Sequence, residues 1–499
     1  MAQETVLQKI ELIKNALLDQ MEKEASNNDP VVLAEWYAFP TFIHRLYRRS
    51  FSHDSQRHQF EESFCEMKSN RERVKMFMGT NKIMRGFKSQ IHKMVKENNR
   101  ERGQSSIKFQ LFRKKATAKL LQAEDETVDE SSFTFPPRHS LYSRSFKGYK
   151  EHDDFPGLSE GLALELIPPK RRGLVATMDY PPKAILSIDR AVATWLSPNL
   201  YAQYCGFCMI KLDTKRVQCS SCKICFFCNE QCFNQALESF HQVECQAMPI
   251  LKQASIIHFV VRIINIVGIH KILEGEWEKM GKIFPAPGGD YIRRFVDLED
   301  SVENITNMDL LSFTNSSLFI ALFLEHTKLV NYPVNTVHLA TSIMSIVITM
   351  SRNIYTIYDH RFQPPTGKHC RGKGKPDMLV EGITREIGYG LFYASSMFNH
   401  SCVPKAFAMF LGDHIVISTY NDVKAGEEIT ISYGTSYPDT HFEKRQEKLK
   451  DNFYFNCVCE QCVIEGSNEQ SQSSRPHRER PKRSKSPKRG QRNVKSGAQ

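Results

Sequence analysis

The first third of the chain has the hydrophobic spacing of helices. Apolar residues recur every three or four positions near the start, as in an amphipathic helix; they are Val6, Ile10, Ile13, Leu17 and Met21. Residues 30–123 also have a mainly helical pattern, with no visible repeat period. An acidic run at 124–130 and a Ser/Pro-rich run at 131–139 then predict a linker. We therefore expect residues 1–139 to form a helical N-terminal extension that ends in this linker.

After the linker, segments with strand patterns alternate with a helical segment. The order is short strands at 161–167 and 172–188, helices from Pro249 to about Ile357, and short strands again at 388–433. Within the last segment, His414–Thr419 and Glu428–Tyr433 are the clearest strands. The sequence therefore predicts an α+β fold in which a helical segment separates two strand-rich segments.

The most apolar stretches are too short to cross a membrane. They lie at Ile256–Ile269 and Leu339–Met350, and neither reaches the roughly 20 apolar residues that a membrane-spanning helix needs. We expect both to be core helices, and we expect no membrane partner. The first 20 residues include Glu4 and Glu11 and lack a continuous apolar segment, so they do not predict a secretory signal.

The net charge favours a polyanionic partner less than its size suggests. The chain has 67 Lys and Arg against 56 Asp and Glu, a charge of +11. Residues 68–119 hold 16 cationic against 3 acidic residues, whereas residues 140–462 hold 33 against 34. The long middle of the chain is therefore not basic. A solvated helix face is the simplest interpretation of 68–119, and direct nucleic-acid binding is the alternative.

The last segment, 463–499, is also basic, with 10 cationic against 3 acidic residues. It is rich in Ser, Gln, Arg, Lys and Pro and nearly lacks apolar residues, so we expect a disordered basic tail. The dense run from Arg475 to Arg489 is typical of a nuclear-import signal or a polyanion contact, and a merely solvated tail is the alternative. We expect the protein in the nucleus and cytoplasm.

Cysteine spacing carries the strongest chemical signal. Eight of the 14 cysteines lie between Cys205 and Cys245, and clustered cysteines in a chain without a secretory signal favour metal binding. Eight ligands at paired spacing suffice for two tetrahedral, closed and structural zinc sites; they are Cys205, Cys208, Cys219, Cys222, Cys228, Cys232, His241 and Cys245. Cys225 lies outside this pattern and is expected to be the spare cysteine; its recruitment by a change of register is the alternative.

A second group of motifs lies between residues 399 and 462. Asn399-His400-Ser401-Cys402-x-Pro404 is followed by the stretch from Gly426 to Gly434, and then by Cys457-x-Cys459-x2-Cys462. The last motif supplies three thiolates and needs a fourth ligand, for which Cys402 is the candidate. A third zinc ion there would join Cys402 to the later triplet, beside Asn399 and His400.

These motifs resemble known families. The run CGFC…CSSC…CFFCNEQC…FHQVEC resembles a MYND zinc finger. That resemblance implies interleaved pairing, with one zinc ion on Cys205, Cys208, Cys228 and Cys232, and another on Cys219, Cys222, His241 and Cys245. MYND fingers commonly bind proline-containing peptides, so the resemblance also implies partners of that kind.

The motifs after residue 388 resemble a SET methyltransferase domain followed by its cysteine-rich post-SET segment. Their order resembles the SET-and-MYND family of protein-lysine methyltransferases over about residues 160–462. The implied fold is a SET-type β-fold split by a MYND finger and a helical insert. The implied segments are 160–204 (SET start), 205–245 (MYND finger), 246–378 (helical insert), 379–434 (SET catalytic end) and 435–462 (post-SET), without the C-terminal helical domain of several relatives.

The resemblance implies a reaction and its residues. S-adenosylmethionine would be the cofactor and a lysine of a protein the substrate. Tyr433 matches the tyrosine near the methyl-transfer centre, and Tyr355 and Phe453 match aromatic residues of the lysine channel. The residues that match cofactor contacts are Asn353, Asn399, His400, Tyr433 and Phe455.

The chain departs from the family pattern beside the cofactor. Arg171 replaces the first glycine of a Gly-x-Gly motif that ends at Gly173, and Lys405 replaces an asparagine after the proline of the 399–404 motif. The arginine predicts one of two outcomes: weaker cofactor binding, or contacts of Lys170 and Arg172 with the cofactor carboxylate instead. The alternative function is a catalytically weak or inactive scaffold that recruits partners in transcriptional repression.

Overall fold

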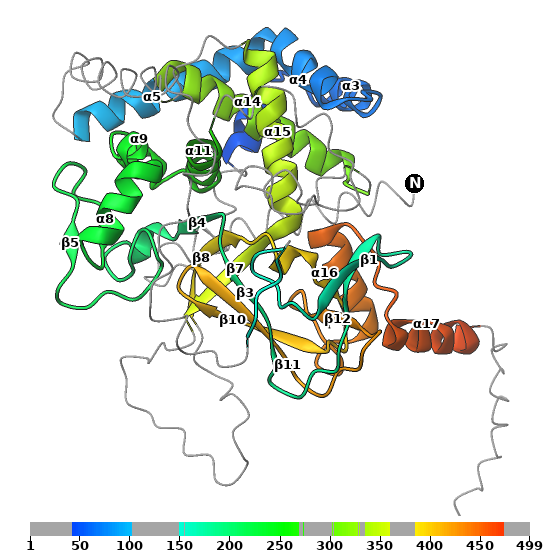
Figure 1. Ribbon diagram of the computed structural model, residues 1–499. Coiled ribbons are helices and arrows are strands. Elements are labelled where there is room, and N and C mark those ends of the chain that lie inside the picture. Colours follow the sequence, from blue (N-terminus) through cyan, green and yellow to red (C-terminus); the bar gives the residue numbers. More distant parts are fainter. Residues whose placement is uncertain are drawn as a thin grey trace, which may run out of the picture.

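A computed structural model describes residues 42–101, 149–153, 155–268, 304–327, 335–359 and 385–473, together with residues 273, 302 and 329. The expected helix near the start, the linker and the cationic run in the tail lie outside these residues. Figure 1 shows the described part as a helical half above a half made mostly of sheets. The α+β fold expected from the hydrophobic pattern is confirmed.

The helical half combines the N-terminal extension with the insert. Its helices are α3 (Asp54–Cys65), α4 (Asn70–Gly79), α5 (Asn81–Glu101), α14 (Asn307–Thr327) and α15 (Thr336–Asn353). A capping box between Ser69 and Glu72 starts α4. Both α4 and α5 pack on α14, with the rings of Phe87 and Phe319 5.4 Å apart. The extension therefore shares one hydrophobic core with the insert.

Helix α14 is the one described helix that is long and apolar enough to cross a membrane by length and composition. However, 72% of its most apolar window is buried inside the protein. It packs along α15, and its apolar residues face neighbouring helices. This packing is that of a core helix, as the sequence predicts for the insert.

The sheets join strands from both strand-rich segments. The early strands are β1 (Leu162–Leu166), β2 (Arg172–Ala176), β3 (Ile185–Arg190) and β4 (Ala193–Leu196). The late strands are β7 (Ile354–Asp359), β8 (Arg385–Leu391), β9 (Asn399–His400), β10 (Ala406–Leu411), β11 (His414–Thr419) and β12 (Glu428–Ile431). They form sheets of order β1-β2-β12-β9, β10-β11-β3 and β4-β8-β7. Each sheet thus contains strands from before and after the insert.

The cysteine-rich segment 205–245 and its continuation lie between these halves (Figure 1). It contains the hairpin β5 (Val217–Gln218) and β6 (Phe226–Phe227), then α8 (Glu230–Ala236), η3 (Leu237–His241) and α9 (Gln242–Glu244). Helices α10 (Met248–Leu251) and α11 (Ser255–Val267) follow it. Such short elements bury little apolar surface of their own, so the segment needs another source of stability.

Two sequence predictions require correction. The helical pattern was expected to reach about Ile357, but α15 ends at Asn353, and β7 pairs antiparallel with β8. A run of apolar residues fits either a helix or a buried strand, and here a distant partner strand decides. The disordered tail was expected from residue 463, but α17 (Glu460–Ser473) is helical to Ser473. Its first turns are held by contacts with α16 (Phe442–Phe453).

Candidate functional site

The candidate site lies where β9 and β12 meet. These strands pair in parallel, with Asn399 opposite Thr430 and His400 opposite Ile431. Tyr433 follows β12 by two residues, and its backbone N–H donates to His400 Nδ1 at 3.1 Å. The Tyr433 hydroxyl donates to the carbonyl oxygen of Phe398 at 2.7 Å. The backbone of Tyr433 is thus fixed to His400, and its hydroxyl to Phe398, the residue directly before the 399–404 motif.

Aromatic side chains surround this tyrosine. The ring centroids of Phe453 and Phe455 lie 4.9 and 6.2 Å from that of Tyr433, and His400 lies 5.4 Å away. Between the two phenylalanines, Tyr454 has a left-handed φ of 62° at the end of α16. The structure thus brings together the aromatic residues that the motifs singled out after residue 398.

Tyr355 comes from β7, on the insert side of the fold. Its hydroxyl donates to the Ser395 carbonyl oxygen at 2.8 Å, and its ring packs edge-on against Phe392. Burial raises the pKa of Tyr355, with a further contribution from neighbouring Tyr433. Burial also raises the pKa of Tyr433. Both phenols therefore stay protonated at neutral pH and act as hydrogen-bond donors.

His400 is a neutral, buried imidazole. Burial lowers its pKa to about 4. Because its Nδ1 accepts the Tyr433 N–H, the ring proton is assigned to Nε2, which faces Cys402 Sγ at 3.5 Å. His400 therefore connects Tyr433 directly to one of the clustered cysteines.

Asn399 is oriented by a residue to which the sequence analysis gave no role. Its Nδ2 donates to the Arg172 carbonyl oxygen at 2.8 Å and to Glu428 Oε1 at 2.9 Å. The other oxygen of Glu428 accepts from Lys170 Nζ at 2.5 Å. The sequence offered one indication that Glu428 belongs to the site, namely its position within the 426–434 motif. Glu428 therefore links the Lys170 ammonium to the Asn399 side chain.

The backbone of β2 approaches Asn399 very closely. A Cβ atom at Gly173 would lie 2.5 Å from Asn399 Nδ2, so a side chain there would displace the asparagine. Arg171, which replaces the expected glycine, has a left-handed φ of 69°. An L-residue adopts that conformation only with strain, which glycine avoids. The fold therefore retains the glycine-type backbone at a position where the sequence has arginine.

Asn353 is the last residue of α15, and it is buried. Its Nδ2 donates to the Thr349 carbonyl oxygen within the same helix. The neighbouring Arg352 donates to the carbonyl oxygen of Phe453 at 3.5 Å, which places this helix end against the end of α16. The insert therefore contributes to the same region as the late strands.

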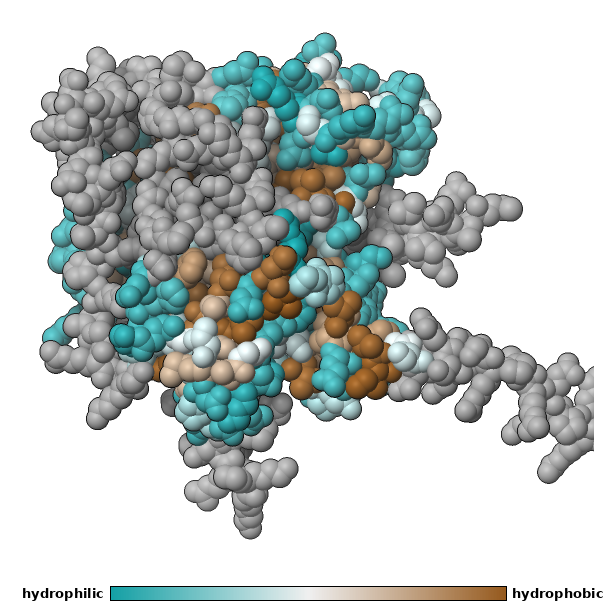
Figure 2. All heavy atoms as spheres, turned by 45° about the vertical axis from the view of Figure 1, so that its right-hand side comes forward, coloured by the Kyte–Doolittle hydropathy of each residue, from teal (hydrophilic) through white to brown (hydrophobic). Residues whose placement is uncertain are grey.

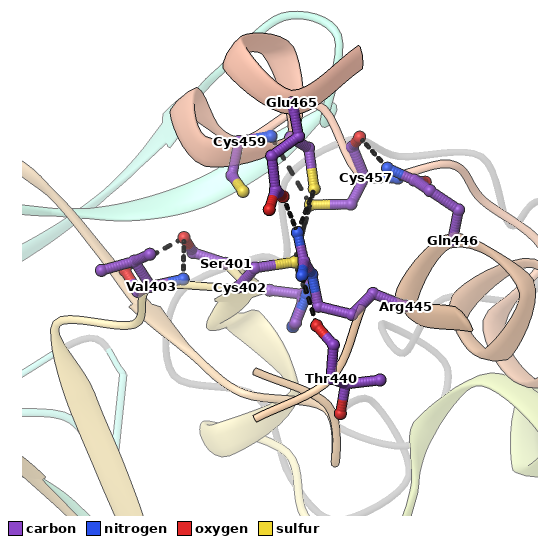
Figure 3. Close-up of polar contacts among 11 residues, drawn as sticks. Ser401, Cys402, Val403, Thr440, Arg445, Gln446, Cys457, Cys459 and Glu465 are labelled. Atoms are coloured by element: carbon purple, nitrogen blue, oxygen red, sulfur yellow. Dashed lines mark hydrogen bonds and ion pairs between the residues drawn. The ribbon is translucent and has the colours of Figure 1, made fainter. Parts of the chain in front are cut away.

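Cys402 and the later triplet form a cluster suited to a metal ion. The Sγ atoms of Cys402, Cys457, Cys459 and Cys462 all lie within 4.8 Å of one another, and all four residues are buried. Figure 3 shows Cys402, Cys457 and Cys459 of this cluster. Cys402 Sγ lies 3.5 Å from Cys462 Sγ and 3.9 Å from Cys457 Sγ. In a tetrahedron with Zn–S bonds of 2.3 Å, the sulfur atoms are about 3.8 Å apart. Four thiolates at this spacing fit zinc.

Helix α16 holds the triplet in place. Gln446 accepts from the Cys457 N–H at 2.8 Å, and its Nε2 donates to the Cys457 carbonyl oxygen at 2.9 Å. Leu449 packs against the same cysteines. Cys402, the fourth ligand expected from the sequence, therefore lies beside a triplet whose position is fixed by α16.

The cysteine-rich segment contains two further four-ligand groups. They are interleaved as expected, one made of Cys205, Cys208, Cys228 and Cys232 and the other of Cys219, Cys222, His241 and Cys245. Distances between ligand atoms include 3.8 Å for Cys208–Cys228 and 3.7 Å for Cys219–Cys245. These again match the edge of a zinc tetrahedron, about 3.8 Å. Cys225 is buried outside both groups, as predicted.

Exposed apolar side chains gather around the Cys402 cluster. They are Val403, Tyr437, Val458, Val463 and Ile464. Figure 2 shows hydrophobic surface, in brown, on the sheet-rich half of this face. Exposed apolar side chains grouped beside one site favour contact with another macromolecule.

Comparison with known proteins agrees with this geometry. A model of the SET domain matches residues 171–434, more than half of the chain. Human protein-lysine N-methyltransferase SMYD4 is 22% identical over 417 residues, covering 70% of this chain and 51% of SMYD4. Human N-lysine methyltransferase SMYD2 is 23% identical over 308 residues, covering 61% of this chain and 60% of SMYD2.

Human histone-lysine N-methyltransferase SMYD3 is 22% identical over 292 residues, covering 58% of this chain and 58% of SMYD3. The chain therefore spans about half to three fifths of the length of these relatives. A solved structure, the SET domain of LSMT bound to lysine and AdoHcy, aligns with 60% of this chain and 53% of its own, at 13% identity and a TM-score of 0.25.

Proposed function

The chain belongs to the SET domain family, and on that premise we propose that it is a protein-lysine N-methyltransferase that uses S-adenosylmethionine. The observation that carries the proposal is the environment of Tyr433. A protonated tyrosine fixed to the 399–404 motif and enclosed by Phe453, Phe455 and Tyr355 is suited to receiving an alkylamine. The related lysine methyltransferases support the same reaction.

The side chains around β9 fit the proposed cofactor. Phe455 offers a ring face beside the imidazole of His400, and Asn399 supplies a fixed carboxamide. S-adenosylmethionine, when bound, supplies a methyl group on a positively charged sulfur. We propose that Asn399, His400, Asn353 and Phe455 hold it. Lys170 and Arg172 are proposed to face its carboxylate, with Glu428 orienting Lys170.

The roles of the remaining residues follow from their chemistry. A lysine amine must be neutral to attack, and a water-poor aromatic channel favours the uncharged form. Tyr355 and Phe453 are proposed to line that channel, while the Tyr433 hydroxyl orients the amine and stabilises developing charge. The apolar surface around Cys402 supports a protein rather than a small molecule as substrate.

The zinc ions are proposed to be structural. Each of the three clusters offers four ligands, which leaves no coordination position for water. The segment 205–245 is proposed to be a MYND finger that binds proline-containing peptides. A peptide-array assay with the zinc-loaded protein tests that partner class.

A Tyr433→Phe variant tests the reaction. It loses one hydrogen bond to the Phe398 carbonyl oxygen, which costs about 1 kcal/mol of stability, so the protein should fold and keep its zinc. We expect transfer of labelled methyl from S-adenosylmethionine to proteins of a cell lysate to fall to background. Tyr420→Phe, at an exposed tyrosine outside the cluster, is the control and should keep full activity. Wild-type turnover by the Tyr433→Phe variant would refute the assignment.

A scaffold without transferase activity is the second candidate. The observation that favours it is Arg171 at the left-handed position beside the proposed cofactor site. Calorimetric titration with S-adenosylmethionine separates the two functions. Binding by folded, zinc-loaded protein supports the transferase, whereas its absence supports a partner-recruiting scaffold.

We also propose that α5 contacts a polyanion such as the phosphate backbone of nucleic acid. Five exposed cations fall within an arc of about 80° on this helix and follow it for about 27 Å; they are Lys82, Arg85, Lys93, Lys96 and Arg100. The opposite side, with Ile83, Phe87 and Ile91, is buried. A localised stripe of cations favours phosphate contact more than the net charge of the chain does.

The proposed location is the nucleus and cytoplasm. It rests on the cationic run from Arg475 to Arg489, which lies outside the described residues. Imaging of the full chain fused to a fluorescent protein tests it. Replacing the lysines and arginines of this run by glutamine should remove the nuclear fraction.

A further inference from the structure

One strongly buried cation lies against the Cys402 cluster. Arg445, on α16, is completely inaccessible to solvent, and its Nη2 lies 3.9 Å from Cys462 Sγ. Figure 3 shows its guanidinium pointing between Cys402 and Glu465, with Thr440 on the other side. Burial alone would lower the pKa of Arg445, but Glu465, Cys462 and Cys402 outweigh burial and raise it.

The charge of the cluster explains why a cation belongs there. Four thiolates around one Zn²⁺ leave a net charge of −2, and a buried charge needs nearby compensation. All four ligands of this cluster are buried, whereas each of the other two clusters has a ligand in contact with solvent. The second group of the finger has histidine as one ligand, so with zinc bound to three thiolates and a neutral imidazole its net charge would be −1 rather than −2. The Cys402 cluster is therefore the site with the greatest need for a positive neighbour.

The hydrogen bonding of Arg445 supports a role based on charge. Its Nη1 donates to the Thr440 carbonyl oxygen, and its Nη2 pairs with the Glu465 carboxylate. Its Nε is buried with no hydrogen-bond partner among the described residues. Leaving a buried N–H unsatisfied costs about 1–3 kcal/mol. The fold retains the arginine despite that cost.

Glu465 extends the arrangement to α17. It lies three residues after the ligand Cys462, and its side chain is 26% exposed. A carboxylate at this position orients the guanidinium, although its negative charge opposes that of the thiolates. Glu465 thus fixes the orientation of Arg445 through an ion pair, while its negative charge offsets part of the positive charge that faces the cysteines.

We propose that Arg445 compensates the charge of the zinc-bound thiolates at Cys402, Cys457, Cys459 and Cys462, and so slows release of zinc from this site alone. The inference rests on the zinc site proposed above. Arg445 is a positioning residue: by keeping zinc on Cys402 it also keeps His400, and through it Tyr433, in place.

The test is release of zinc from the full chain to a chromogenic chelator. Arg445→Gln should release one of three zinc equivalents about 10- to 100-fold faster than wild type, and the other two at wild-type rates. Arg445→Lys, which keeps the charge, should stay close to wild type. Lys444→Gln, at an exposed cation one residue away, is the control for loss of charge on α16. Cys402→Ser, which should lack the affected equivalent, identifies it.

Glu465→Gln distinguishes charge compensation by Arg445 from a purely structural role of the Arg445–Glu465 ion pair. It also tests the proposal if Arg445→Gln does not fold. If Arg445 acts by charge, removing the carboxylate should make zinc release no faster than in wild type. Faster release from Glu465→Gln would mean that the ion pair only ties α17 to α16, which overturns the proposal. Wild-type release kinetics in Arg445→Gln would also overturn it. A wild-type protein with only two zinc equivalents would instead refute the underlying zinc site.

Discussion

At the residue scale, the loop before β2 shows how the fold can override a side chain. Arg171 adopts a backbone conformation that favours glycine, and Gly173 tolerates no Cβ atom beside Asn399. Sequence comparison with the family pattern identified the missing glycine at 171. It did not reveal that the backbone conformation is retained, because φ depends on the pairing of β2 with β1 and β12.

The two positions should respond oppositely to substitution. Arg171→Gly relieves a left-handed conformation that costs an L-residue about 1–2 kcal/mol, so we expect unchanged or increased thermal stability and unchanged cofactor affinity. Gly173→Ala pushes Asn399 away from Glu428 and crowds Ile167, so we expect weaker binding of S-adenosylmethionine and a lower unfolding temperature. Thermal unfolding and calorimetric titration measure both effects. Equal cofactor affinity of the two variants would contradict this account.

Glu428 provides a second prediction at this scale. Its two oxygens accept from Asn399 and Lys170, so Glu428→Gln replaces one acceptor by a donor and separates Lys170 from its counter-charge. We expect a loss of about 1–3 kcal/mol in cofactor binding, which is roughly a 5- to 150-fold weaker affinity. Glu427→Gln, one residue earlier and paired with Lys405, is the matched control. An equal effect of the two substitutions would argue against an orienting role for Glu428.

At the element scale, the sequence predicted most helices and strands but missed two boundaries. His414–Thr419 is a strand as expected, because a short run of β-branched apolar residues, Ile415 to Ile417, specifies a buried strand locally. The end of the helical insert and the start of the disordered tail were wrong, because α15 ends at Asn353 and α17 continues to Ser473. Strand β7 forms because it pairs with β8. Helix α17 begins within the Cys459-x2-Cys462 motif, and its Glu465 pairs with Arg445 of α16. A sequence pattern spans only neighbouring residues, so it does not reveal that β8 pairs with β7 or that Arg445 contacts α17.

The basic stripe on α5 gives a prediction at the same scale. We expect a fluorescent DNA duplex to bind with an affinity that falls steeply as salt rises, because phosphate contacts release counterions. Replacing the five stripe cations by glutamine should weaken binding at least about tenfold at low salt. Replacing Lys444, Lys448 and Lys450 on α16 is the control. Unchanged anisotropy titrations of the α5 variant would leave the stripe a solvated helix face.

At the scale of the whole molecule, a buried polar cluster joins the finger to the rest of the fold. Glu244 of α9 accepts from Arg262 Nη2 at 2.6 Å and lies 2.9 Å from His258 Nε2. Arg262 also donates to the Thr194 carbonyl oxygen of β4 at 2.9 Å and lies over the ring of Phe240. Burial alone would raise the pKa of Glu244, but Arg262 and His258 lower it to about 2. The carboxylate is therefore charged and fully paired at neutral pH.

Removing one member of this cluster should be severe. Arg262→Met leaves the Glu244 carboxylate buried without its main partner, and breaking a buried pair in this way costs about 3–5 kcal/mol. We expect a large fall in the denaturant midpoint with three zinc ions still bound in the folded protein. The exposed Arg216, which lies over Phe226, provides a control as Arg216→Met. Equal stability of the two variants would exclude an essential role for the buried cluster.

Zinc removal should act on both ends of the split fold. The segment 205–245 consists of very short elements, and the Cys402 cluster holds the loop that fixes His400, so we expect both to need zinc for stability. We expect three zinc ions per chain, and we expect chelation to lower the unfolding temperature and to abolish methyl transfer. Re-addition of zinc should restore both. A chelated protein with unchanged unfolding temperature would contradict structural roles for these sites.

The sequence by itself determined the three candidate ligand sets and the α+β class, and the family resemblance implied the pairing order and the role proposed for Tyr433. These features depend on residue type and short spacing, which a linear sequence preserves. Only the tertiary structure showed that Glu428 holds Asn399, that Arg445 lies against Cys462, and that His400 lies between Cys402 and Tyr433. Arg445 and Cys402 are 43 positions apart, and Lys170 and Glu428 are 258 apart. Contacts across such separations arise from strand pairing and shared burial, which no local pattern encodes.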